Sequence, residues 1–102
     1  MRKEAELLKA AMKGKKAVSV NRSILGTAVR HYQTNIFVES PGKVVLSSGG
    51  LSSVTTKRHI NNCFRALGMS ARVYQKNYTW FVEFQGVEYT FYDGIALTWK
   101  IE

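Results

Sequence analysis

Residues 47–68 read SSGGLSSVTTKRHINNCFRALG and separate two groups of strand-like segments. Within this stretch, four apolar residues recur at positions i, i+3, i+4 and i+7, which is the pattern of one helical face. They are Ile60, Cys63, Phe64 and Leu67. Ser53 or Thr55 can cap the start of such a helix, and Gly68 is a natural end. The pattern predicts a helix over residues 55–67 and a buried Phe64.

The opposite face of this helix is polar and basic. Lys57, Asn61 and Arg65 recur at i, i+4 and i+8, with Arg58 and Asn62 beside them. Two interpretations remain open. The first is an ordinary amphipathic helix with a solvated outer face. The second is a surface that binds phosphates, because every one of these side chains can reach phosphate oxygens or base edges.

The residues before this stretch predict a helix and then strands. Residues 1–14 are rich in alanine, leucine, glutamate and lysine, which favour a helix over 3–13. Residues 17–47 contain β-branched and aromatic segments, with strands near 25–31 and 35–39. Pro41 and Gly42 form a turn signal, so 35–47 is expected to be a β-hairpin.

The residues after the stretch predict a β-meander over 70–101. Trp80, Val82 and Phe84 alternate with more polar neighbours, as in a strand that is half buried. Turns are expected around Lys76–Asn77 and at Gln85–Gly86. The dipeptide Asp93–Gly94 is a strong signal for a further local hairpin.

These elements predict an α+β fold in one domain spanning residues 1–102. We expect one curved antiparallel sheet of six to seven short strands, or two small sheets. One central helix packs on an apolar face, and an N-terminal helix precedes the strands. The order is a helix in 1–14, strands in 17–47, a helix in 55–67 and the meander in 70–101.

The charge is unevenly distributed along the chain. The net charge is +8, made up of +11 over residues 1–76 and −3 over residues 77–102. A one-sided basic chain commonly meets a polyanion or an acidic protein surface. The single cysteine, Cys63, excludes an internal disulfide, and no apolar run is long enough for a membrane span. We therefore expect a soluble, cytoplasmic protein that does not contact a membrane.

A resemblance covers roughly residues 36–98. The segments VVLSSGG, SSVTTKRHIN, ARVYQK, WFVEF and FYDGIAL resemble small proteins of tailed bacteriophages that form a family of unknown function. The most specific residues are Gly49, Gly50, Thr55, Thr56, Lys57, Ile60 and Asn61. Leu51 departs from the pattern, which has an aromatic residue there. The resemblance implies a phage source and no mechanism, and it leaves the N-terminal helix outside.

The sequence gives little support for a catalytic or metal-binding site. Glu83 and Glu88 can face each other across a turn, which is more typical of a solvated sheet face than of an acid–base pair. Cys63 and His59 are helical neighbours, but Cys63 belongs to the apolar stripe, where thiols are inert. Adding His31 makes no recognisable metal motif. We expect no enzyme activity, no metal and no cofactor.

The favoured function is nucleic-acid binding, with DNA or RNA as the partner. The predicted site combines a loop with the basic helix face: Gly49, Gly50, Ser52 and Ser53, followed by Thr55, Thr56, Lys57, Arg58, Asn61, Asn62 and Arg65. Free amides at a helix start attract anions. The alternative is a protein-interaction module that inhibits or redirects a host enzyme, and a weaker third possibility is a virion component. A second basic cluster, Lys13, Lys15, Lys16 and Arg22, is the fallback site.

Exposed aromatic residues would favour single strands, since bases stack on them. The sequence leaves the faces of Tyr74, Tyr78, Phe81 and Tyr92 undecided. Because the N-terminal helix lies outside the resemblance, we also expect the sheet to fold without residues 1–14.

Overall fold

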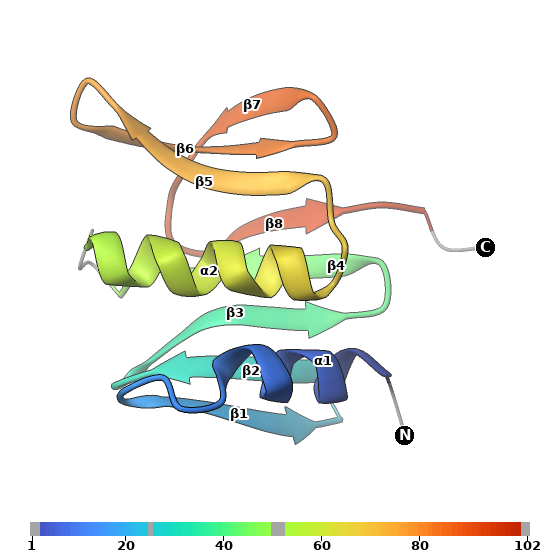
Figure 1. Cartoon of the computed structure of the whole chain (residues 1–102). Coiled ribbons are helices and arrows are strands. Elements are labelled where there is room, and N and C mark those ends of the chain that lie inside the picture. The colour runs from blue at the N-terminus through green and yellow to red at the C-terminus, as the bar shows by residue number, and fades with distance from the viewer. Residues whose placement is uncertain (1–2, 25, 50–52, 101–102) are drawn as a thin grey trace.

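The computed structural model describes residues 3–24, 26–49 and 53–100. The elements in chain order are α1 (Lys3–Met12), β1 (Val18–Ser23), β2 (Gly26–His31), β3 (Thr34–Ser40), β4 (Lys43–Leu46), α2 (Val54–Ala66), β5 (Ala71–Lys76), β6 (Thr79–Phe84), β7 (Val87–Thr90) and β8 (Ile95–Thr98). The predicted α+β class is confirmed (Figure 1).

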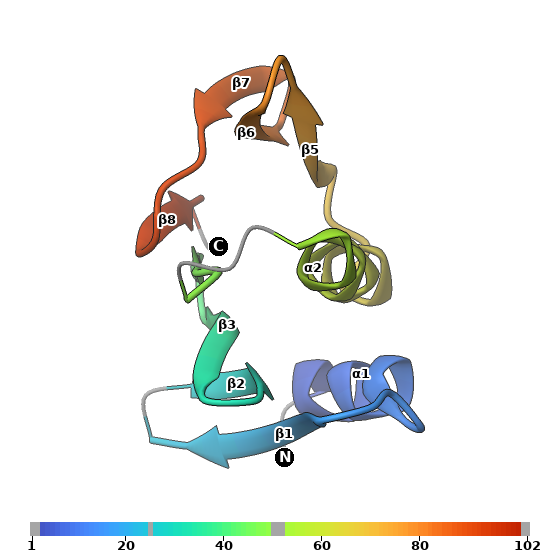
Figure 2. The ribbon, with the colours of Figure 1, turned by 90° about the vertical axis from the view of Figure 1, so that its left-hand side faces the viewer.

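The strands form two antiparallel sheets and not one curved sheet. The larger sheet has the order β1-β2-β3-β4-β8, and the smaller has the order β5-β6-β7. Both helices cover the same face of the larger sheet, with α1 beside α2 (Figure 2). The smaller sheet continues from α2 through β5. No helix in the described ranges is long and apolar enough to cross a bilayer.

Helix α2 starts, packs and ends as its sequence predicts. The Ser53 hydroxyl accepts a hydrogen bond from the Thr56 amide at 3.1 Å, which satisfies one of the unpaired donors of the first turn. The predicted apolar stripe is buried at Ile60, Cys63 and Phe64. Gly68 has φ +67°, and the Met69 amide returns to the Phe64 carbonyl at 2.9 Å, so the chain leaves the helix there.

Helix α1 is part of the core. Its residues Ala5, Leu8 and Met12 are buried, and the helix packs against α2, β1 and β2. The spacing of these three residues places them on one face, which is why the helix lies flat on the sheet. This packing argues against the prediction that the sheet folds without residues 1–14.

Three of the local hairpins lie at or next to turns that the sequence predicts. Strands β3 and β4 join at Pro41–Gly42, and β6 and β7 join at Gln85–Gly86. The turn between β5 and β6 uses Asn77 and Tyr78, one residue later than predicted. Both central residues of these last two turns have positive φ, as the two-residue turns that suit twisted strands require.

The prediction of a local hairpin at Asp93–Gly94 is wrong. Strand β8 pairs with β4, not with β7, and the Gly94 amide donates to the Leu46 carbonyl at 2.8 Å. The Asp93 carboxylate accepts hydrogen bonds from the Ser48 amide, the Ser48 hydroxyl and the Gly49 amide, at 2.8, 2.9 and 3.0 Å. Three bonds to a charged acceptor, together with burial of Ile95 and Leu97, outweigh a local turn.

Candidate nucleic-acid interface

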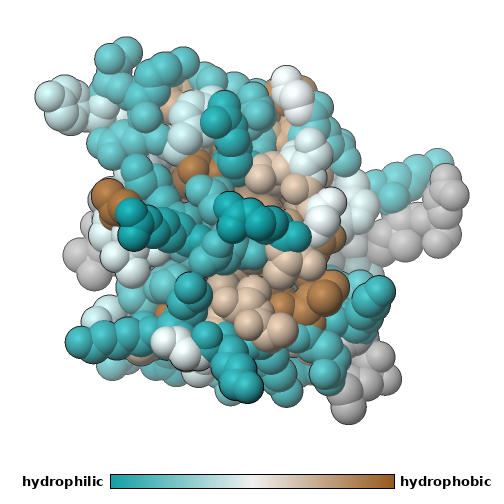
Figure 3. All heavy atoms as spheres, in the orientation of Figure 1, coloured by the Kyte–Doolittle hydropathy of each residue, from teal (hydrophilic) through white to brown (hydrophobic). Residues whose placement is uncertain are grey.

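The predicted binding residues of α2 divide by exposure. Thr55, Arg58 and Arg65 are exposed, whereas Lys57 and Asn62 are half-buried. The α2 segment contains no acidic residue, so its outer side carries only positive charge. Figure 3 shows long hydrophilic side chains crossing the middle of this face, over α2. This part of the predicted surface is brought together as one side of one helix.

Two of the predicted residues instead serve the helix start. Thr56 is only 2% exposed, and its hydroxyl lies 2.9 Å from the Ser53 hydroxyl. Ser53 also caps the helix by accepting from the Thr56 amide. Since its side chain is buried, Thr56 has no surface to offer a nucleic acid, and Ser53 has an internal role. Neither residue is therefore included in the candidate nucleic-acid interface.

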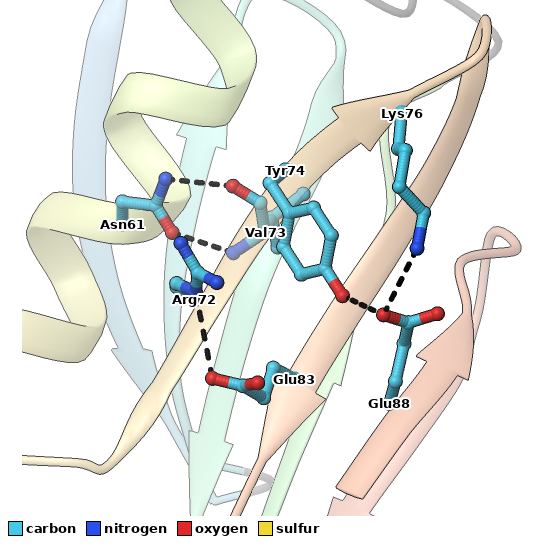
Figure 4. A network of polar contacts seen from close by, with 7 residues as sticks. All are labelled: Asn61, Arg72, Val73, Tyr74, Lys76, Glu83 and Glu88. Carbon is cyan, nitrogen blue, oxygen red and sulfur yellow. Dashed lines mark hydrogen bonds and ion pairs between the residues drawn. The ribbon is translucent and has the colours of Figure 1, made fainter. Parts of the chain in front are cut away.

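Asn61 is committed to the neighbouring strand. Its amide nitrogen donates to the Val73 carbonyl at 2.9 Å, and its amide oxygen accepts from the Val73 amide at 2.7 Å (Figure 4). Val73 lies on β5, an outer strand of the smaller sheet. The side chain therefore replaces the partner strand that β5 lacks on this side. Both the nitrogen and the oxygen of the Asn61 amide are thus engaged by the protein itself, which argues against a role in reading a base edge.

We predict that Asn61→Ala lowers the free energy of unfolding by about 1–3 kcal/mol, because it leaves a donor and an acceptor of Val73 without partners. Denaturant unfolding measures the loss, and the Val73 amide should exchange its hydrogen much faster. Asn62→Ala is the matched control, because its side-chain oxygen accepts only from the Arg65 guanidinium at 3.0 Å. Unchanged protection of Val73 in Asn61→Ala would contradict this role.

Lys57 joins α2 to the smaller sheet. Its ammonium group lies 3.4 Å from the Gln75 amide oxygen and 5.4 Å from the centre of the Trp80 ring. A cation over an indole face is attracted by the ring electrons. Lys57 therefore contributes positive charge to the surface but is held in place by the sheet. Arg58 makes no hydrogen bond or ion pair with any described residue, so its guanidinium faces solvent unpaired.

The loop before α2 holds an anion, but the anion belongs to the protein. The amides of Ser48 and Gly49 both donate to the Asp93 carboxylate. Gly49 has φ +70°, and a Cβ there would lie 2.2 Å from the Thr34 hydroxyl oxygen, so only glycine fits. The predicted loop residues Gly50 and Ser52 lie outside the described residues. The amide of Gly49 is thus already occupied and offers nothing to a phosphate.

The outer face of the smaller sheet adds an aromatic pair that the sequence left undecided. Tyr74 and Phe81 are cross-strand neighbours whose rings stack with centres 5.9 Å apart and an angle of 28°. The Arg72 guanidinium lies 4.6 Å from the Tyr74 ring centre, and the Lys76 ammonium lies 5.2 Å from that of Phe81. Alternation with the buried Val73 was the signal that places Arg72, Tyr74 and Lys76 on one face.

Both cations of this outer face are already paired with carboxylates. Arg72 lies 3.4 Å from Glu83, and Lys76 lies 3.7 Å from Glu88 (Figure 4). The Tyr74 hydroxyl donates to Glu88, and this bond raises the pKa of Tyr74 to about 12. Glu83 and Glu88 do face each other in the register of β6 and β7. Each one pairs with a cation, so together they form a neutral surface and not an acid–base pair.

A shallow hollow connects α2 to the fallback basic cluster. It lies between α1 and α2, has a volume of about 270 Å³, and is lined by Ala11, Lys15, Asn62, Arg65 and Ala66. Lys15 follows α1 in the chain and is far from Arg65 in sequence, so only the packing of the two helices brings them together. The basic surface therefore extends from Arg58 across Arg65 to Lys15.

The buried histidine and cysteine of α2 show no sign of a nucleophile. Burial raises the pKa of the Cys63 thiol to about 12, so the thiolate is strongly disfavoured. Burial also lowers the pKa of His59, and nearby His31 and Lys15 lower it further. The His31 and His59 rings meet edge to face at 4.9 Å. Within the described ranges, no group of three or more potential ligands could hold a metal ion.

One family model matches nearly the whole chain. The family described as Kyanoviridae Gp96 protein matches residues 1–98. This confirms the phage source that the resemblance implied. The match also includes α1, which the resemblance had left outside. No curated protein and no solved structure matches the chain.

Proposed function

We propose that this chain, which belongs to the Kyanoviridae Gp96 protein family, binds nucleic acid through the outer side of α2. The proposed surface, called here the α2 surface, consists of Lys15, Thr55, Lys57, Arg58, Asn62 and Arg65. It is smaller than the sequence suggested, because Ser53, Thr56, Asn61 and Gly49 have internal roles. Its contacts are with the phosphate backbone and carry no base recognition.

The observation that carries this proposal is positive charge without neighbouring carboxylates. Among the described residues, the ion pairs lie on the smaller sheet, and none of them involves Lys57, Arg58 or Arg65. Guanidinium groups without a carboxylate partner on one exposed side of a helix suit phosphate oxygens, which they contact with paired donors. A purely structural surface gains little by leaving like charges beside one another.

The aromatic pair beside α2 favours single strands over duplexes. Strand β5 lies next to α2 and carries Tyr74, whose cross-strand neighbour is Phe81 (Figure 1). Because Arg72 and Lys76 are neutralised by glutamates, this sheet face can contribute base stacking and little charge. In the proposed complex, the backbone follows α2 and one or two bases stack on the sheet.

The test is binding of fluorescein-labelled dT20, U20 and a 20-base-pair DNA duplex, followed by fluorescence anisotropy over a salt series. We expect dT20 to bind more tightly than the duplex. Replacing two single-strand phosphate contacts, as in Arg58→Ala/Arg65→Ala, should reduce the slope of log K against log salt by about 1.4. If the two proteins bind equally at 1 M salt, this corresponds to a loss of affinity of roughly 25-fold at 0.1 M salt.

The matched control removes the same charge elsewhere. Lys43 begins β4 and Lys100 follows β8, both are exposed and neither belongs to the α2 surface, so Lys43→Ala/Lys100→Ala should bind almost as wild type does. No binding by the wild type at low salt would reject the proposal and favour a protein partner. Equal losses in both double variants would show that net charge, and not the α2 surface, carries binding.

A further inference from the structure

The largest hollow among those described lies away from the α2 surface, between the two sheets. It has a volume of about 770 Å³, and residues of β7 and β8 line most of it. Three of its side chains are large, apolar and exposed: Val87 at 50%, Tyr89 at 42% and Tyr92 at 62%. Among the described residues of its lining, Glu88 is the one that is charged. We call this hollow the β7–β8 groove.

Both strands that border the groove are outer strands of their sheets. Strand β7 pairs only with β6, and β8 pairs only with β4, within the part of the chain that the structure describes. The Trp99 amide donates to the Gly42 carbonyl, so paired residues alternate along β8 and the backbone groups of Ala96 and Thr98 point away from β4. In β7, the bond from the Phe91 amide to the Trp80 carbonyl sets the same alternation, so the backbone groups of Glu88 and Thr90 point away from β6.

These four residues also line the groove. By this alternation, their amides and carbonyls take no part in the ladders with β4 and β6, and no turn or loop bond to a described residue involves them. The groove therefore presents two rows of backbone donors and acceptors beside an exposed apolar surface. That combination is what an added strand requires.

The other two outer strands are protected against such pairing. On β5, the Asn61 side chain occupies the amide and the carbonyl of Val73. On β1, the exposed residue Arg22 places a charge at the edge, and the charged Lys15 and Lys16 precede the strand. Charges and edge-covering groups are the usual protection of an open sheet edge. Strand β8, with the sequence IALT, has neither.

We propose that the β7–β8 groove binds an extended segment of a partner protein, which adds as a strand to the free edge of β8. Alternate side chains of that segment contact Val87, Tyr89 and Tyr92. A polyanion is disfavoured as the occupant, because none of the described residues that line the groove is a lysine or an arginine. The same protein thus has a basic surface on α2 and a separate protein-binding edge.

The experiment uses the full chain, labelled with ¹⁵N, and a capped hexapeptide. Valine stands at every second position of the peptide, and the remaining positions hold threonine and one lysine. Titration should shift the amide signals of Glu88, Thr90, Ala96 and Thr98 and leave those of α2 unchanged. The same peptide, N-methylated at alternate residues, cannot donate to a strand edge. It should bind at least about tenfold more weakly, which is the effect of losing one good hydrogen bond.

The matched pair of variants places proline on each free edge of the larger sheet. Ala96→Pro removes an amide that points into the groove and should weaken peptide binding at least about tenfold. Arg22→Pro makes the equivalent change on β1. The bond from the Tyr32 amide to the Ala17 carbonyl sets the alternation there, so the Arg22 amide points away from β2. This variant should leave peptide binding unchanged. The N-methylated peptide tests the wild type itself and so does not depend on either variant folding.

Three results would overturn the proposal. The first is the absence of shifts at millimolar peptide, or equal binding of both peptides. The second is a shift of the same four amides by dT20, which would assign the groove to nucleic acid. The third is self-association of the free protein in sedimentation that Ala96→Pro abolishes, which would assign the edge to a second copy of the chain.

Discussion

Removal of residues 1–14 is expected to abolish cooperative unfolding. The deletion takes Leu8 and Met12, which are 0% and 3% exposed, out of the core together with Ala5. It also uncovers the surfaces of α2, β1 and β2 against which α1 packs. Losing one buried leucine or methionine side chain costs about 2–5 kcal/mol, and the total stability of a domain is only about 5–15 kcal/mol. Thermal melts followed by circular dichroism should show no sharp transition.

Two full-length variants separate packing from charge. Leu8→Ala/Met12→Ala should lower the melting temperature strongly, because it removes the same buried side chains. Lys9→Ala/Lys13→Ala changes exposed residues of the same segment and should alter the free energy of unfolding by no more than about 0.5 kcal/mol. A shortened chain that still melted sharply, within a few degrees of the full chain, would show that α1 is an appendage.

Phe64→Ala should lower the free energy of unfolding by about 3–5 kcal/mol, the cost typical of a phenylalanine removed from a core. The side chain is 1% exposed. Its ring meets Phe37 of β3 edge to face, with centres 5.5 Å apart and an angle of 73°. The substitution therefore leaves a cavity between α2 and the larger sheet and also loses an aromatic contact. Urea unfolding at equilibrium measures the change.

The next residue along α2 supplies the control. Arg65 is exposed on the opposite side, so Arg65→Ala should stay within about 0.5 kcal/mol of the wild type. A loss below about 1 kcal/mol for Phe64→Ala would mean that the larger sheet and α2 are held together elsewhere. It would also undermine the assignment of the α2 surface, since the outer side of the helix is defined by the inner one.

Part of the candidate site could be predicted from the residues alone. Arg58 and Arg65 are outward because Ile60 and Phe64 are inward, and a period of 3.6 residues links the two. Asn61 has the same outward position by periodicity, yet β5 passes beside it and takes both of its hydrogen-bonding groups. Helical periodicity gives the direction of a side chain but not what the rest of the chain places there.

The same distinction explains the loop before α2. Glycine and serine before a helix start correctly indicate amides that can hold an anion. That the anion is Asp93, far away in sequence, follows only from the pairing of β8 with β4. The aspartate–glycine dipeptide suggested a local turn because such signals describe only neighbouring residues.

By itself, the sequence determined the elements whose causes are local: the span and capping of α2, the turns at Pro41–Gly42 and Gln85–Gly86, and the buried faces of β6 and α2. It also determined the separation of a basic region from an acidic C-terminal part. Only the tertiary structure decided that the strands form two sheets, that Lys15 lies near Arg65, and that β7 and β8 leave a groove between them. The physical reason is that propensity and periodicity act over a few residues. The partner of a distant strand or polar group is chosen by the burial and hydrogen bonding of the whole chain.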